Sequence, residues 1–435
     1  MKTNEQIADL IRQRKFDGVR YAAIDRLTLN KLDAQAWLYL GQAMVGLKRG
    51  TMAKLCFERS VLLDPFATWI QQAWNDATAV GEGREDKQVL KLLEVSQISV
   101  STCILTRNNS ATIRQCIESL RGAVDEIIVV DTGSTDDTVQ IVESLGIEVH
   151  HFQWVDDFSA ARNYALAFTT SDWIFSIDSD ETLYKEDRDK IHTVASLFNG
   201  GLYILSVFQM NQIHESIRPF PAPRMFKRNY FTWRNAIHEE VVLLPSVPTS
   251  IPNSQAVNIR VHHSGYDPAQ TDTTAKVNRN IHILKKSLES DPTNHGILYY
   301  LGREVFILQK YSETVQLLEK AYSCSLESFG STLLPEISQI LAESYIHLGQ
   351  TEDAVRCLER ITKDRPEHPN GWYLLGFVLK DSDPERSRTC LLKSKEVGLT
   401  YRGASEFDPE IATWKADHLL NANKMQGPIP PLALR

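Results

Sequence analysis

The sequence of 435 residues lacks the features that would place it in a membrane or on nucleic acid. No run approaches the roughly 18 apolar residues of a membrane-spanning helix. The first residues contain no apolar signal-peptide core. Basic residues are not in excess: the chain has 47 Lys and Arg and 55 Asp and Glu, which gives a net charge of −8. We therefore expect a cytoplasmic protein that binds neither nucleic acid nor a membrane surface.

Cysteine is also scarce, and none of the six cysteines forms a CxxC pair. Most lie inside apolar, periodic segments, so we interpret them as buried, reduced thiols rather than as nucleophiles. Hydrophobic residues nevertheless make up 43% of the chain and charged residues 23%. That composition is enough to bury a large core, and it excludes disorder along most of the chain.

Changes of pattern divide the chain into several parts, and the length alone suggests about three domains. We expect a helical region, a charged linker, an α/β domain, a second helical region and a tail, at residues 1–80, 81–97, 98–270, 271–425 and 426–435. Within the α/β part, the proline-rich segment 245–253 is expected to be a loop.

Repeat-like spacing occurs in both helical regions. In the first, six positions match the tetratricopeptide repeat, a helix–turn–helix unit of about 34 residues; they are Trp37, Leu40, Gly41, Ala53, Phe57 and Pro65. In the second, degenerate matches occur at Leu301-Gly302, at Tyr345 with Gly349, and at Trp372 with Leu375-Gly376. Such repeats offer a concave surface for a peptide or protein. Alternatively, they pair two copies of the chain as a homodimer or brace the middle domain.

The middle region alternates strands and helices, which predicts crossover connections and a mostly parallel sheet. Strands are expected at 98–105, 126–130, 148–152, 173–177 and 202–208, with helices at 113–120 and 139–145. Ligands of such sheets bind beyond the carboxyl ends of the strands. Polar segments follow three of these strands, at 106–109, 131–134 and 178–180.

The acidic segment Asp178-Ser179-Asp180-Glu181 follows a buried strand directly. Three carboxylates in four residues repel one another unless a cation or hydrogen-bond donors compensate. Mg²⁺ or Mn²⁺ uses one or two carboxylates together with substrate phosphates. The alternative is an acidic turn that caps the next helix, but the place at a strand end favours a metal.

The turn that begins at Asp131 follows the strand EIIVV. Gly133 permits a tight turn, and Ser134 or Thr135 can cap a helix that begins near Asp136. The Asp131 carboxylate would accept a hydrogen bond from a ligand donor, such as the imide N–H of uracil. The alternative is a plain strand–turn–helix connection.

Three further groups are candidates for the same pocket. Arg162, in a segment that precedes a predicted helix, could bridge phosphate oxygens, although a single arginine is usually a solvated residue. His238 and Glu239 could supply a general base. His263, the second of two adjacent histidines, could complete a metal site or touch the phosphates, although a strand histidine is more often structural.

The ordered motifs ILTRNN, EIIVVDTGSTDDT, DDFSAARN, DWIFSIDSDE and IHEE resemble glycosyltransferase family 2 over about residues 98–265. The resemblance implies a GT-A (Rossmann-like α/β) catalytic domain flanked by all-α repeat regions, and inverting transfer from a nucleotide sugar with Mg²⁺ or Mn²⁺. It implies roles for the matching residues. Asp131 would bind the nucleobase, Asp178 would face the ribose or sugar, Asp180 would bind the metal, and Arg162 would lie by the pyrophosphate. Glu239 or its neighbour His238 would be the general base. Thr106, Asn108 and Ser179 at the same strand ends join the donor-binding set. Thr132 departs from the family, because many members carry a second acid there.

The chain has no QxxRW motif, which argues against a processive polysaccharide synthase. With repeats on both sides, it resembles the glycosyltransferases of ribosomal bacteriocin peptides, the sublancin glycosyltransferase type. That similarity implies a UDP-sugar donor, with UDP-glucose favoured, and a Cys or Ser acceptor in a small peptide. The alternatives are a family 2 enzyme acting on a cell-surface glycan or lipid intermediate, and a non-catalytic repeat scaffold.

Overall fold

The computed structural model describes residues 2–213, 216–248, 251–263, 273–327, 333–401 and 407–422. The chain forms two compact units, residues 1–271 and 272–435, which are treated separately below. The predicted tail 426–435 lies outside the described residues. Within the described residues, no helix is both long and apolar enough to cross a membrane.

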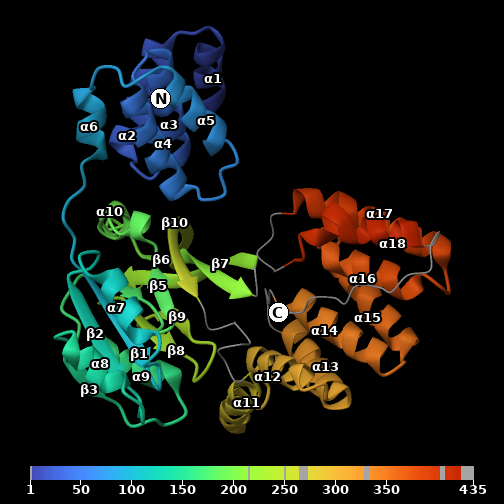
Figure 1. Ribbon diagram of the computed structural model, residues 1–435. Helices are drawn as coiled ribbons and strands as arrows, with labels where there is room; N and C mark the ends of the chain where they lie inside the picture. The colour runs from blue at the N-terminus through green and yellow to red at the C-terminus, as the bar shows by residue number, and fades with distance from the viewer. Residues whose placement is uncertain are drawn as a thin grey trace. The chain divides into compact units, whose positions relative to one another are not determined.

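The first unit opens with a helical region (Figure 1). Its helices are α1 (Asn4–Arg12), α2 (Phe16–Leu29), α3 (Ala34–Gly46), α4 (Gly50–Leu63), α5 (Ile70–Ala79) and α6 (Lys87–Leu93). A Cβ atom at Gly41 would lie 2.2 Å from the Phe57 ring, so only glycine allows α3 and α4 to pack this closely. Trp37 and Phe57 are buried between the helices. The repeat-like packing predicted for this hairpin is therefore confirmed.

The α/β part of this unit is built on an eight-stranded sheet with the order β3-β2-β1-β4-β7-β6-β10-β5. The strands are β1 (Val100–Thr106), β2 (Glu126–Asp131), β3 (Val149–His151), β4 (Trp173–Ser176), β5 (Glu181–Leu183), β6 (Tyr203–Ile213), β7 (Ser216–Lys227) and β10 (Asn253–His263). A separate hairpin pairs β8 (Phe231–Arg234) with β9 (Glu240–Leu243). The connecting helices are α7 (Ile113–Leu120), α8 (Thr138–Ser144), α9 (Phe158–Leu166) and α10 (Lys190–Leu197), with a 3₁₀ turn at Lys185–Asp187.

The expectation of a mostly parallel sheet is correct for β3, β2, β1 and β4, which run parallel, and for the parallel pair of β6 and β10. Strand β7 is antiparallel to both of its neighbours, and β5 is antiparallel to β10. Strand β7 carries Pro219, Pro221 and Pro223, which pair with β6, while β4 pairs with β7 only from Met225 to Lys227. The prolines thus lie where β7 has one neighbour, the position that a residue without an N–H tolerates.

Two local predictions near the site were wrong. Ser134 and Thr135 do not cap α8, which begins at Thr138; they contact Asn108 instead. Arg162 does not precede a helix but lies inside α9, whose cap is Asp157 accepting from the backbone of Ala160 at 2.8 Å. The partner of Ser134 and Thr135 thus lies on another loop and not at the nearest helix end.

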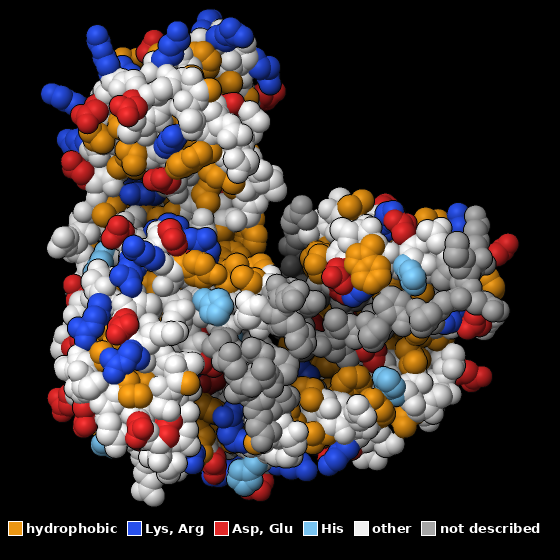
Figure 2. All heavy atoms as spheres, in the orientation of Figure 1, with side chains coloured by type: hydrophobic (Ala, Val, Ile, Leu, Met, Phe, Trp, Pro, Cys, Tyr) orange, Lys and Arg blue, Asp and Glu red, His pale blue; other side chains and the backbone are white. Residues whose placement is uncertain are grey.

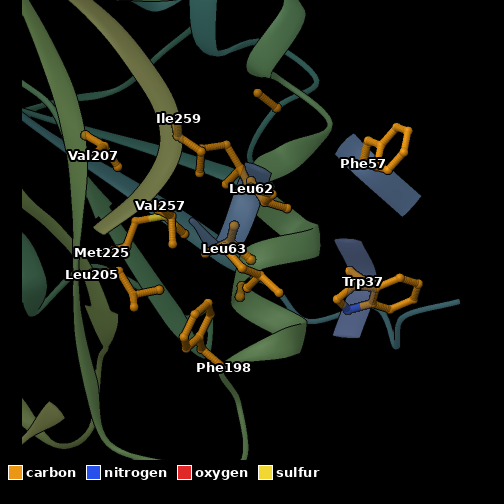
Figure 3. Close-up of a cluster of buried hydrophobic side chains, with 14 of the residues drawn as sticks. Trp37, Phe57, Leu62, Leu63, Phe198, Leu205, Val207, Met225, Val257 and Ile259 are labelled. Carbon is orange, nitrogen blue, oxygen red and sulfur yellow. The ribbon is translucent and has the colours of Figure 1, made fainter. Parts of the chain in front are cut away.

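The N-terminal helices share a hydrophobic core with the sheet. Leu62 and Leu63 at the end of α4 point toward Val257 and Ile259 of β10 (Figure 3). The Gln255 side chain donates to the backbone carbonyl of Leu63 at 3.1 Å. On the face shown in Figure 2, acidic and basic side chains are interspersed, in keeping with the modest net charge.

The second unit is helical (Figure 1). It contains α11 (Thr273–Ser290), α12 (His295–Ile307), α13 (Tyr311–Glu327), α14 (Leu334–His347), α15 (Thr351–Asp364), α16 (Pro369–Leu379), α17 (Pro384–Thr400), a π-helical turn (Ile411–Lys415) and α18 (Ala416–Ala422). A Cβ atom would lie 2.4 Å from Leu318 at Gly302 and 2.7 Å from Leu391 at Gly376. These glycines therefore repeat the close helix approach made by Gly41, as the repeat spacing predicted.

Glu343 on α14 should make the stability of the chain depend on pH. The residue is only 5% exposed, its carboxylate accepts from the Gln339 amide at 3.2 Å, and burial raises its pKa to about 8. A carboxyl whose pKa is raised on folding contributes stability below its unfolded pKa of about 4.3 and loses it as pH rises to 8. We expect Glu343→Gln to raise the thermal midpoint at pH 8.5 more than at pH 6. An equal shift at both pH values would contradict this prediction.

Candidate functional site

The parallel strands bring the predicted polar segments together at their carboxyl ends. The Asn109 side-chain oxygen accepts from Ser179 Oγ at 2.9 Å and from Thr106 Oγ1 at 3.4 Å. Asn108, with a left-handed φ of 55°, accepts from the backbone of Thr135 at 2.8 Å. The loops after β1, β2 and β4 are thus tied to one another by hydrogen bonds, and Thr106, Asn108 and Ser179 lie in one cluster.

Asp131, at the end of β2, stabilises the turn that follows it. Its carboxylate accepts from the backbone N–H groups of Gly133 at 3.0 Å and Ser134 at 3.1 Å, and Gly133 has a φ of 104° that favours glycine. The Asp131 side chain is only 4% exposed. Its Oδ2 atom lies 3.6 Å from Nδ1 of His151, at the end of β3.

Asp178, directly beyond β4, is held by two arginines. Its Oδ1 accepts from Arg162 at 2.8 Å and its Oδ2 accepts from Arg224 of β7 at 2.9 Å. Burial alone would raise the pKa of Asp178, but the charges and hydrogen bonds of Arg224 and Arg162 hold it well below its usual range. Asp178 is therefore an ionised carboxylate with one guanidinium partner on each oxygen.

Glu181, which the sequence placed in the acidic trio, is fully buried behind the turn. It accepts from Arg224 at 2.7 Å, from Gln209 of β6 at 2.6 Å and from the backbone of Asp178 at 2.8 Å. Burial raises its pKa to about 7, with the nearby charge of Asp178 adding to the shift and Arg224 opposing it. Glu181 thus fixes the turn that presents Asp180 and lies away from solvent.

Arg162 of α9 connects Asp178 to the loop between β8 and β9. Its guanidinium donates to Glu239 at 2.9 Å and to Ser176 at 3.1 Å, and it lies 4.9 Å from the centre of the Trp233 ring. The guanidinium therefore binds three protein acceptors, Asp178 included.

Helix α9 also holds the loop between β8 and β9 through two other polar side chains. Ser159 Oγ donates to the carbonyl of Asn235 at 2.6 Å, and Asn163 accepts from the backbone N–H of Trp233 at 2.9 Å. Asn235 and His238 adopt left-handed φ angles of 76° and 54°, which are uncommon for residues other than glycine. The DDFSAARN segment thus holds the His238–Glu239 loop in an uncommon backbone conformation, of a kind that clusters at functional sites.

Asp180, which is part-exposed, and His263, which is buried, lie side by side at the same end of the sheet. His263, the last residue of β10, lies in register with Glu181 of β5. Its Nδ1 lies 2.8 Å from the Asn211 side-chain oxygen, and its Nε2 lies 3.4 Å from Asp180 Oδ2. Burial opposes protonation of His263, but Asp180 and the neighbouring acids raise its pKa. The Asp180 side chain is 30% exposed and so reaches solvent.

This donor set fits a hard cation that is shared with a substrate. Among the described residues, no group of three or more His, Cys, Asp or Glu side chains could hold a metal ion. The Asp180 carboxylate and the His263 imidazole are therefore too few to coordinate a metal ion by protein ligands alone. It matches the pattern in which Mg²⁺ takes one or two carboxylates and completes its shell with phosphate oxygens and water.

The structure thus gathers predicted residues into three groups. The first is the strand-end cluster described above, the second is the ion-paired set of Asp178, Arg162 and Glu239, and the third is the pair of Asp180 and His263. Sequence reasoning missed Arg224, Gln209 and Asn211, all on β6 and β7. The arginine in PAPRMFK carries a detectable signal only if that proline-rich segment is recognised as a strand.

Part of the chain is similar in sequence to known glycosyltransferases. Residues 101–230 match the family model Glycosyl transferase family 2. The chain is 33% identical over 232 residues to the SPbeta prophage-derived glycosyltransferase SunS of Bacillus subtilis, a match covering 52% of this chain and 54% of SunS. It is 30% identical over 187 residues to an uncharacterized glycosyltransferase of Rickettsia felis, covering 40% of this chain and 66% of that protein. The chain therefore spans only about half the length of SunS.

A third relative and one solved structure complete the comparison. A TPR repeat-containing protein of Synechococcus elongatus is 44% identical over 94 residues, 22% of this chain and 23% of that protein. The glucosyl-3-phosphoglycerate synthase from Mycobacterium tuberculosis, solved with Mn²⁺ and UDP-glucose, is 27% identical and aligns with a TM-score of 0.23. That alignment covers 26% of this chain and 44% of the synthase.

Proposed function

We propose that the chain transfers a hexose from a UDP-sugar to a Cys or Ser side chain of a small ribosomal peptide, on the premise that residues 101–230, which match the glycosyl transferase family 2 model, form a domain of that family. The observation that carries the proposal is the part-exposed Asp180, which lies beside the buried His263 and next to the arginine-held Asp178 at one end of the sheet. The peptide acceptor and the preference for glucose rest on the resemblance to bacteriocin peptide glycosyltransferases.

The donor would bind across the carboxyl ends of β1, β2 and β4. Thr106, Asn108 and Ser179 would line the donor site, where hydrogen bonds join their loops. Asp180 and His263 would hold Mg²⁺ or Mn²⁺, which when bound neutralises negative charge on a departing diphosphate. Both oxygens of Asp178 accept from arginines, so we assign Asp178 and Arg162 chiefly to positioning of the Asp180 turn and of the loop at 235–239.

The acceptor would be activated at the His238–Glu239 loop. Glu239 is engaged by Arg162, so a proton taken up by Glu239 would disrupt that ion pair. This arrangement favours His238 as the general base and Glu239 as its positioning residue. A thiol acceptor, with a pKa of about 8.5, needs only modest help to become a thiolate, whereas a hydroxyl needs a base throughout. Attack from the face opposite the diphosphate would invert the configuration.

The second unit would contribute to acceptor binding. Its helices form successive repeat-like pairs, and such stacked repeats present extended concave surfaces that suit peptides. We propose that this unit selects the peptide and that the strand-end site carries out the transfer, in the cytoplasm, where an acceptor thiol stays reduced.

Mass spectrometry of small peptides containing Cys and Ser tests the proposal. Each peptide is incubated with the full chain, Mn²⁺ and one of a panel of UDP-sugars. We expect a gain of one hexose on a peptide that has a reactive side chain and none on the peptide with that residue replaced by alanine. Chelation of the metal should abolish the gain. The proposal fails if no UDP-sugar is consumed with any peptide while the chain remains folded.

A further inference from the structure

Asn211, His263 and Glu181 form one row across three neighbouring strands. Asn211 of β6 lies in parallel register with His263 of β10, and His263 lies in antiparallel register with Glu181 of β5. Each of the three residues is at most 8% exposed. Register partners project from the same face of a sheet, so the backbone pairing itself brings these side chains together. Asp180, the residue before Glu181, lies beside the row at its solvent side.

The hydrogen bond between Asn211 and His263 fixes which ring nitrogen faces Asp180. Nδ1 of His263 lies 2.8 Å from the side-chain oxygen of Asn211. That oxygen can only accept, so Nδ1 carries the hydrogen of this bond whether or not Nε2 is protonated. Nε2 is the nitrogen directed to Asp180, at 3.4 Å from its Oδ2 atom. A histidine that binds a metal through one nitrogen commonly donates from the other, which fixes its tautomer and the orientation of its ring.

Strand β6 carries a second amide on the same face, and it serves a different neighbour. Gln209, two residues before Asn211, donates to the Glu181 carboxylate at 2.6 Å. Gln209 therefore holds the acid behind the turn, whereas Asn211 holds the imidazole that lies beside Asp180. Of these two amides, Asn211 is the one that contacts a proposed metal ligand.

We propose that Asn211 is a positioning residue for the metal, which orients His263 so that Nε2 and the Asp180 carboxylate face the same cation. The inference rests on the proposed function, because it assumes that Asp180 and His263 hold Mg²⁺ or Mn²⁺. It adds a residue on β6 that acts through His263 without touching the cation.

Calorimetric titration of the full chain with Mn²⁺, in the presence of UDP, tests this inference. Asn211→Leu removes the acceptor at similar size, while Asn211→Asp keeps an oxygen in the same place and adds a charge that strengthens the bond. We expect Asn211→Leu to weaken Mn²⁺ binding about 10–100-fold, the usual cost of losing such a partner. Asn211→Asp should bind Mn²⁺ at least as tightly as wild type.

Pulsed electron paramagnetic resonance of the bound Mn²⁺ reports the orientation of the ring separately. Coupling of Mn²⁺ to an imidazole nitrogen should be present in wild type and in Asn211→Asp, and it should be lost in Asn211→Leu. The matched control is Asn258→Leu, the same substitution at a half-buried position of β10, five residues before His263. Both the Mn²⁺ affinity and the nitrogen coupling should be unchanged in this control.

The inference is overturned if Asn211→Leu binds Mn²⁺ with wild-type affinity, or if Asn211→Asp loses as much affinity as Asn211→Leu. Absence of the nitrogen coupling in the wild-type chain would overturn it as well. If Asn211→Leu does not fold, Asn211→Asp decides alone, because the inference requires that it keep both the affinity and the coupling. A wild-type chain that binds no UDP, or binds it indifferently to Mn²⁺, would instead refute the proposed function.

Discussion

Replacing Asp180 by alanine should lower the rate of sugar transfer by about 10²–10³-fold, the loss seen when one group that stabilises transition-state charge is removed. Asp180 is the part-exposed carboxylate of the acidic segment, and His263 is its neighbour at 3.4 Å. Without it, the cation that neutralises the leaving diphosphate would lose its carboxylate ligand. The rate is measured with saturating UDP-sugar and peptide, so that the change in kcat is separated from weaker binding.

Asp189→Ala is the matched control for this variant. Asp189 is an exposed acid ahead of α10 whose side chain makes no cap hydrogen bond, and it lies outside the proposed site. Its replacement should leave the rate unchanged. A transfer rate in Asp180→Ala within a few-fold of wild type would remove Asp180 from the metal site.

Replacing Arg224 by methionine should lower the free energy of unfolding by about 3 kcal/mol, the low end of the cost of breaking a buried ion pair. Arg224 is buried, and a single nitrogen, Nη2, donates to both Asp178 and Glu181. Its loss would leave Glu181 buried without a cation, whereas Asp178 would keep Arg162. Urea unfolding measures the change. Arg224→Lys, whose single ammonium could contact both acids, should recover part of it.

The loss in Arg224→Met should grow with pH. Glu181 already has a pKa raised to about 7, chiefly by burial, and Arg224 opposes that shift. Without Arg224 the folded-state pKa of Glu181 rises further. The wild-type chain stops losing stability to ionisation of Glu181 once the pH passes about 7, whereas the variant continues to lose stability above that pH, so the difference between them grows. Arg234→Met is the control, because its ion pair with Glu240 is exposed on both sides and should contribute at most about 1 kcal/mol. A loss independent of pH would contradict this assignment of Glu181.

Local patterns allowed much of the fold to be predicted. The strands at β1, β2 and β4 and the helices α7 and α8 follow apolar periodicity that a few neighbouring residues define. The spacing of Gly41 and Phe57 predicted a close helical hairpin, because the Phe57 ring fills the space that a side chain at position 41 would occupy. The placement of Asp131 and Asp178 at strand ends follows from the same local reading.

The rest depends on pairings that local patterns do not reveal. Strand β7 was missed because three alternating prolines argue against a strand unless one of its sides is open. Because β7 was missed, Arg224 was missed too. Its guanidinium donates to both Asp178 and Glu181 and so offsets the repulsion between these two neighbouring acids. Ser134 and Thr135 have the residue types of helix caps, yet Asn108 contacts both from another loop. Such partners, separated by dozens of residues, become visible only in the folded chain.

The most direct test of the central claim is a calorimetric titration of the wild-type chain with UDP, with and without Mn²⁺. If Asp180 and His263 hold a cation shared with the diphosphate, UDP should bind in one saturable site whose affinity rises strongly with Mn²⁺. Asp180→Ala should remove that increase, while Asp189→Ala should keep it. No UDP binding, or binding indifferent to both Mn²⁺ and residue 180, would contradict the account.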